Sequence, residues 1–92
     1  MVFIMNPAPK MASFDVKIID IVNMGSENQH IKFRFLDDTK SSMKNFWGIS
    51  FGGANKYSEL NVGDRVSVVY TLEFNNFNGN HDIQFKIIDI KK

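Results

Sequence analysis

The pair Asn78-Gly79 lies between two segments rich in bulky apolar and β-branched residues, Arg65–Phe74 and Asp82–Ile90. Asn-Gly is the pair best suited to a type I′ hairpin turn, because both central residues of that turn need a positive φ. The two segments are therefore predicted to form an antiparallel hairpin. The six residues 75–80, NNFNGN, are expected to form the turn, with Phe77 near its tip.

Two further segments show apolar residues at the two-residue spacing of a strand. In Phe14–Met24 the residues Phe14, Val16 and Ile18 share one face, after which the apolar positions change phase, so a bulge or bend is expected near Ile18–Asp20. His30–Leu36 alternates most clearly. Its predicted inward residues are Ile31, Phe33 and Phe35, and its predicted outward residues are His30, Lys32 and Arg34.

The segment NFWGISFG, residues 45–52, is a third predicted strand in the order of the chain. We expect Trp47, Ile49 and Phe51 on its inward face and Phe46, Gly48 and Ser50 on its outward face. The stretch that follows, GGANKYSEL, has room for about one helical turn before the hairpin begins.

These segments amount to five strands in 92 residues, enough for one domain. We predict an all-β fold, a five-stranded barrel of the OB type with Greek-key topology and a short helical turn between strands 3 and 4. An open antiparallel sheet is the alternative, but the many inward aromatic residues favour a closed barrel. Because Pro7 and Pro9 break the start of the chain, residues 1–12 are expected to be an extended lead or linker and residues 13–92 the OB-fold domain.

The residue inventory argues against catalysis within this chain. The two histidines, His30 and His81, have no metal-ligand spacing, and no phosphate-binding glycine loop is present. There is no cysteine, and no apolar run approaches the roughly 18 residues that span a bilayer. We therefore expect a cytoplasmic protein that is not an enzyme, has no cofactor of its own and does not contact a membrane.

A nucleic-acid-binding surface is the function that remains. Single strands are bound by cations that follow the phosphates and by aromatic rings on which bases stack. The net charge of +1 means that such binding depends on local clustering of cations. The candidate residues, from the second to the fifth predicted strand, are Lys32, Arg34, Lys44, Phe46, Phe77 and Lys86.

Each candidate has a structural alternative. The cations are typical of any solvated strand face, Phe46 is also suited to packing against another part of the protein, and Phe77 is also suited to packing on its own hairpin. Trp47, the only tryptophan, is assigned to the core because it shares the phase of Ile49 and Phe51.

The sequence resembles the OB domain of RecJ, the single-strand-specific DNA exonuclease. The likeness rests on LNVGDRVSVVYTLEFNNFNGNHDIQFKIIDI at 60–90, on HIKFRF at 30–35 and on GISFG at 48–52. Either NPAP at 6–9 or VFI at 2–4 matches the segment that precedes that domain. In one position the chain departs from the family, because Trp47 stands where a small or polar residue is usual.

The resemblance implies that this chain is a single-stranded DNA-binding module of a RecJ-like 5′-3′ exonuclease with roles in DNA repair and recombination. Its partners would be single-stranded DNA and the catalytic core of the same parent chain, where the family binds Mn²⁺ or Mg²⁺. The isolated domain would be a monomer. Two alternatives remain open, an interdomain or protein-docking module and a stand-alone protein similar to replication protein A.

Overall fold

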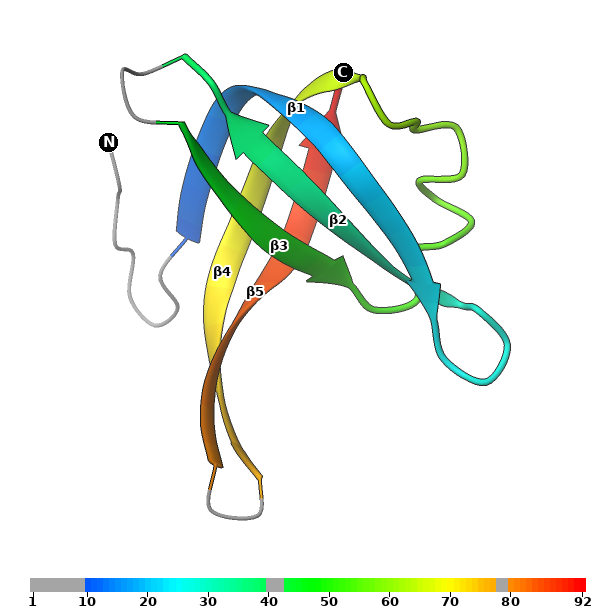
Figure 1. Ribbon diagram of the computed structural model, residues 1–92. Coiled ribbons are helices and arrows are strands. Elements are labelled where there is room, and N and C mark those ends of the chain that lie inside the picture. Colours follow the sequence, from blue (N-terminus) through cyan, green and yellow to red (C-terminus); the bar gives the residue numbers. More distant parts are fainter. Residues whose placement is uncertain (1–9, 40–42, 78–79) are drawn as a thin grey trace.

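The barrel consists of five strands that follow one another without an intervening helix in the part of the chain that is described (Figure 1). The computed structural model describes residues 10–39, 43–77 and 80–92. The strands are β1 (Lys10–Met24), β2 (His30–Asp37), β3 (Lys44–Ser50), β4 (Arg65–Phe77) and β5 (Asn80–Lys91). They close in the order β1-β2-β3-β5-β4, so the predicted five-stranded OB-type barrel is confirmed. The predicted division of the chain at residue 12 stays a prediction, and β1 already begins at Lys10.

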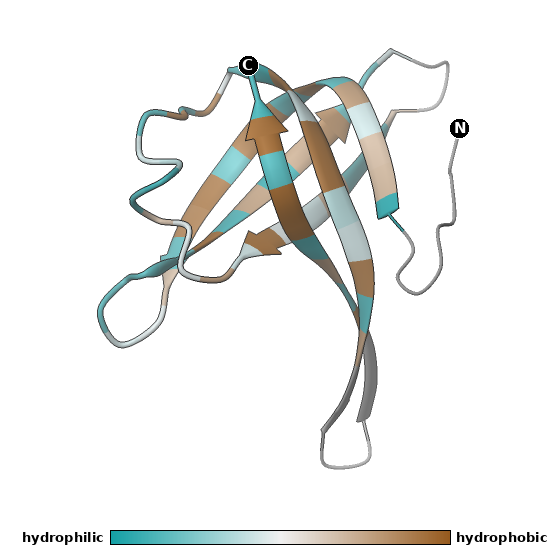
Figure 2. Ribbon diagram, turned by 180° about the vertical axis from the view of Figure 1, so that it is seen from behind, coloured by the Kyte–Doolittle hydropathy of each residue, from teal (hydrophilic) through white to brown (hydrophobic). Residues whose placement is uncertain are grey.

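The core is formed by the inward-facing residues of the strands, and β2 shows the most regular alternation of buried and surface residues. In β2 the predicted inward residues Ile31, Phe33 and Phe35 are buried, and the residues between them reach the surface, as predicted. The alternation of hydrophobic and hydrophilic bands along the strands is visible in Figure 2. The buried core comprises Val16, Ile18, Ile31, Phe33, Phe35, Tyr57, Val66, Val68, Ile87 and Ile90.

Strand β1 contains two irregularities, of which one was predicted. Its pairing with β2 shifts between Ile18 and Asp20, which confirms the expected bend. Its pairing with β4 also shifts between Ser13 and Val16, where Asp15 has a φ of 54°. This second bulge turns Phe14 outward, so the prediction that Phe14 shares the inward face of Val16 is wrong.

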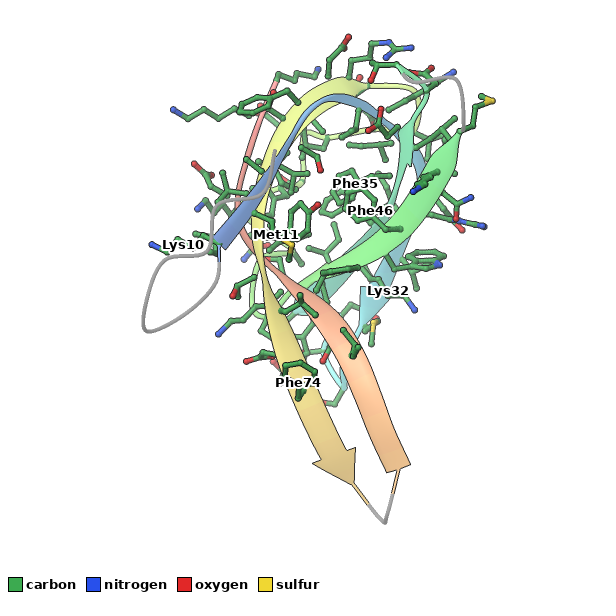
Figure 3. The ribbon with its side chains drawn as sticks, turned by 90° about the vertical axis from the view of Figure 1, so that its left-hand side faces the viewer. Lys10, Met11, Lys32, Phe35, Phe46 and Phe74 are labelled. Carbon is green, nitrogen blue, oxygen red and sulfur yellow. The ribbon has the colours of Figure 1, made fainter. Side chains whose placement is uncertain are left out.

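The prediction that Trp47 points inward and Phe46 outward from β3 is wrong. Phe46 is paired with the inward Phe35 across the β2–β3 register, and directly paired residues share a face of the sheet. Phe46 therefore packs against the core, as Figure 3 shows beside Phe35, and Trp47 faces outward. Gly48 also faces inward, where an added Cβ would lie 3.0 Å from Cγ1 of Ile87, so it leaves no room for a base.

Between β3 and β4 the chain forms a series of turns that covers one end of the barrel. The expected helical turn is limited to a single hydrogen bond of α-helical spacing, in which the Tyr57 N–H donates to the Gly53 carbonyl at 3.0 Å. Tyr57 is buried against Phe33. No helix within residues 10–39, 43–77 and 80–92 is long and apolar enough to cross a membrane.

Strands β4 and β5 extend well beyond the barrel as a two-stranded arm (Figures 1 and 3). Pairing of β4 with β1 ends at Thr71, whereas pairing of β4 with β5 continues to Phe77 and Asn80. The predicted six-residue turn is therefore mostly strand. The two strands flank residues 78–79, and the turn type at Asn78-Gly79 lies outside the described residues.

Arg65 links the bulge of β1 at Asp15 to Asp38, the residue that follows β2. Its guanidinium donates to both carboxylate oxygens of Asp38, at 2.7 and 3.1 Å, and makes a longer contact of 3.5 Å with Asp15. Hydrogen bonding to Arg65 holds the pKa of Asp38 below its ordinary value, so this ion pair is formed at neutral pH. The contact with Asp15 fixes the backbone next to Phe14.

Candidate nucleic-acid interface

Two cations of β2 converge on the tryptophan of β3 on the outer face of the barrel. Arg34 is directly paired with Trp47, and Lys32 lies two residues away on the same face of β2. The Lys32 ammonium lies 4.6 Å from the centroid of the Trp47 ring and the Arg34 guanidinium carbon 5.7 Å from it. Cation–π contacts of this kind hold the two charges beside the indole. A ring for stacking and charges for phosphate thus lie side by side.

Asn45 fixes the direction of the Arg34 guanidinium. The Arg34 Nε and one terminal nitrogen both donate to Oδ1 of Asn45, at 3.1 and 2.9 Å. The remaining N–H groups of the fork are not used by this contact, and a guanidinium donates well to phosphate oxygens. Arg34 is therefore pre-oriented on the surface.

A groove of about 340 Å³ runs beside Trp47, between β3 and the base of the arm. One side is formed by Asn45–Ile49 and the other by Ile83–Phe85, with Lys32 at the rim. The groove exists because β3 and β5 pair only at two positions, Gly48 with Phe85 and Ile49 with Lys86, and part from each other before Gly48.

Ile49 gives the groove an apolar lining. Gly48 faces the core, so Ile49, the next residue, points to the outer face of the sheet and is not part of the core cluster. Its side chain is nevertheless only 3% exposed. It pairs with Lys32 on β2. An apolar lining with a cation at the rim suits the flat apolar face of a nucleobase next to a charged backbone.

The predicted cations differ in how they are used. Among the described residues, Lys32, Arg34 and Lys44 have no carboxylate within ion-pair distance, whereas Lys86 reaches Glu73 at 4.0 Å. Lys44 is exposed at the start of β3. Lys86 pairs with the outward Ile49 and lies on the same face, but it contacts Glu73, whereas Lys44 is in phase with the inward Phe46. Lys32 and Arg34 are therefore the two cations that the fold brings beside Trp47.

The predicted aromatic contacts need revision. Phe46 was expected to project outward, but its ring packs between Phe35, Tyr70 and Phe85, with centroids 5.3, 5.1 and 5.8 Å away. Only part of it reaches the groove. Phe77 is the last residue of β4, and its side chain lies outside the described part of the structure.

The arm contributes an apolar wall that the sequence pattern did not reveal. Phe74 and Ile83 are directly paired across the arm and are 74% and 63% exposed. Ile83 lines the groove, and Figure 3 shows Phe74 on the arm below the barrel. One sequence signal for this wall was available. Phe74 and Ile83 are apolar residues near the Asn-Gly turn, at the ends of strands too long to be buried along their whole length in a small barrel.

Trp47 was missed as a surface residue because large apolar side chains occupy both faces of β3. One available signal was the glycine at position 48. A glycine on the inward face marks a place where the core approaches the backbone closely, which assigns Phe46 to the same inward face.

Comparisons with known proteins agree with this architecture. The family model of the RecJ OB domain matches residues 4–89. No curated protein sequence matches the chain significantly.

Solved structures of single-stranded DNA-binding proteins share the fold. Mitochondrial Rim1 of S. cerevisiae superimposes with a TM-score of 0.70 at 16% identity, covering 91% of this chain and 94% of Rim1. The small single-stranded DNA-binding protein of Streptomyces coelicolor gives a TM-score of 0.58 at 16% identity, covering 94% of both chains. The SSB domain of a Synechococcus protein gives 0.57 at 8% identity, covering 90% of this chain and 93% of that domain. At these identities the likeness shows the fold alone.

Proposed function

This chain belongs to the RecJ OB domain family, and from that premise we propose that it binds single-stranded DNA on the outer face of β2 and β3. The observation that carries the proposal is the convergence of Lys32 and Arg34 on Trp47 beside an apolar groove. Rim1 and the Streptomyces protein, which share the fold, are single-stranded DNA-binding proteins, and this supports the same function.

In the proposed complex one unstacked base enters the groove and stacks on Trp47. Lys32 and Arg34 contact the flanking phosphates. Ile83 and Phe74 on the arm cover the base from the other side. A duplex has its bases stacked and paired, so only an unpaired strand offers a base to this groove without the cost of unstacking.

We further propose that the module serves a RecJ-like 5′-3′ exonuclease, where it holds the strand for a catalytic core outside this chain. Within the described residues no group of three or more His, Cys, Asp or Glu side chains could hold a metal ion, so no step of this function is assigned to Mn²⁺ or Mg²⁺ here. The module is proposed to bind and position the strand without cleaving it.

Reversal of both cations on β2 tests the binding surface. Lys32→Glu/Arg34→Glu is expected to weaken binding of a labelled oligo-dT of about 15 nucleotides by about tenfold or more, because two phosphate contacts become repulsions. Each phosphate contact on a single strand contributes about 0.7 to the slope of log affinity against log salt, so the slope should also fall by about 1.4. Fluorescence anisotropy from 20 mM salt upward measures both quantities.

A matched control separates this surface from net charge. Lys10→Glu/Lys92→Glu makes the same change in net charge at two exposed lysines away from the groove. It should retain most of the affinity at moderate salt. Equal losses in the two double variants would refute a localised binding surface, and absence of wild-type binding at 20 mM salt would refute the function.

A further inference from the structure

On the side of the barrel away from the groove, a bulge presents an aromatic ring to solvent. Phe14 is 72% exposed, although Val16 and Ile18, which follow it at two-residue spacing, are fully buried. The bulge depends on Asp15, whose positive φ is uncommon for a residue other than glycine. Arg65 reaches both the carbonyl oxygen of Asp15, at 3.4 Å, and its carboxylate. The outward direction of Phe14 is thus fixed by the fold.

The strand register arranges the surface around Phe14 as two short rows across β1, β4 and β5. In the first row Ser67 pairs with Lys91, and Phe14, which lies in the bulge without a register partner, lies beside them. The second row is Ala12, Val69 and Asp89. A hollow of about 270 Å³ is lined by Phe14, Ser67, Val69, Asp89 and Lys91.

The surface is apolar on β1 and carries one charge of each sign on β5. This balance offers nothing to a polyanion such as DNA, whereas an apolar centre with a charged edge is typical of a protein interface. The two rows are also complementary to each other. The large ring of Phe14 in the first row corresponds to the small Ala12 in the second, and the cation Lys91 corresponds to the anion Asp89.

We propose that this surface, formed by Ala12, Phe14, Ser67, Val69, Asp89 and Lys91, binds a second copy of the same chain around a two-fold axis. If the axis lies in the interface, parallel to the two rows and midway between them, the first row of each copy packs on the second row of the other copy. Phe14 then lies on Ala12 of the second copy, and Lys91 on Asp89 of the second copy, and the same contacts recur by symmetry. A two-fold interface requires such self-complementarity.

One ion pair within the chain bears on this arrangement. Lys56 reaches Oδ1 of Asp89 at 3.8 Å, the oxygen that also accepts the Ile90 N–H. The two side chains are 62% and 43% exposed, so the contact is weak and the second carboxylate oxygen is not used by it. It leaves the Asp89 carboxylate able to accept a second cation. The dimer would also keep both grooves accessible, because the residues that line the groove and those of the proposed interface form separate sets.

Sedimentation equilibrium over a concentration range from about 10 µM to 1 mM tests the proposal. The wild-type mass is expected to rise from that of one chain toward that of two. Phe14→Ser removes the central ring, a typical interface anchor, and should weaken dimerisation by about tenfold or more. Val62→Ser, which removes another exposed apolar side chain elsewhere, should dimerise like the wild type.

A charge exchange distinguishes contacts between copies from effects within one copy. Asp89→Lys alone should weaken the dimer, and Asp89→Lys/Lys91→Asp should restore it, although the contact with Lys56 is lost in both variants. A wild type that stays monomeric to 1 mM, or a double variant no better than the single one, would overturn the proposal. DNA binding by these variants should be unaffected for a short oligonucleotide, so failure of the dimer and failure of the DNA-binding function give different results.

Discussion

Trp47→Ala is expected to lower the affinity for single-stranded oligo-dT by about 10- to 100-fold. The indole is the ring that the groove offers to a base, and stacking of one base on an aromatic side chain contributes about 1–3 kcal/mol. Trp47 faces outward from β3, so the free energy of unfolding should change little by comparison. Anisotropy titrations and urea unfolding of the same variant measure the two effects.

Two control variants sharpen this result. Trp47→Phe keeps an aromatic ring and should retain most of the affinity. Phe46→Leu alters the neighbouring ring, which packs on the core, and should lower stability while leaving affinity near that of the wild type. If Phe46→Leu lost affinity and Trp47→Ala did not, the assignment of faces on β3 would be refuted.

Phe35→Ala is expected to destabilise the domain by about 3–5 kcal/mol, because truncation of a fully buried phenylalanine leaves a cavity. The ring lies 5.8 Å from Phe33 and 5.3 Å from Phe46, so its loss affects the packing of β2 and β3 together. Small domains have total stabilities of about 5–15 kcal/mol, so the variant should unfold at markedly lower urea concentration. Equilibrium unfolding followed by circular dichroism measures this shift.

The exposed phenylalanine of the arm supplies the comparison. Phe74→Ala removes a side chain of the same type from a solvated position and should change stability by about 0.5 kcal/mol or less. Phe35→Leu preserves most of the volume and should cost less than about 1.5 kcal/mol. A loss below about 1.5 kcal/mol for Phe35→Ala would contradict the position of this residue at the centre of the core.

The fold was predictable where only one face of a strand is apolar. In β2 polar residues separate Ile31, Phe33 and Phe35, so the alternation has a single interpretation and the structure confirms it. The bend of β1 near Ile18–Asp20 was predictable for a related reason, since the apolar positions change phase there.

The candidate site was predictable only in part, because β3 carries large apolar residues on both faces. Alternation alone then cannot distinguish the face of Phe46 from that of Trp47, and the pairing with Phe35 decides between them. That pairing is a property of the register between two strands, which no single segment specifies. The cations of β2 were identified correctly as outward residues, whereas their aromatic partner was not.

The outward ring of Phe14 could not be predicted for another reason. The bulge that turns it outward is held by Arg65, which is distant in the sequence and contacts Asp15 only in the folded barrel. The length of the arm was likewise underestimated. Asn75 and Asn76 are typical of turns, but the structure pairs them with Asp82 and His81 as strand residues.

The intrinsic fluorescence of Trp47 gives the most direct test of binding at the outer face of β2 and β3. It is the only tryptophan in the chain, so its signal reports on this groove alone. Titration with unlabelled oligo-dT at 20 mM salt should quench the emission with the same binding curve that anisotropy of a labelled strand gives, and added salt should reverse both. Binding by anisotropy without a change in the tryptophan emission would contradict contact between the DNA and this face.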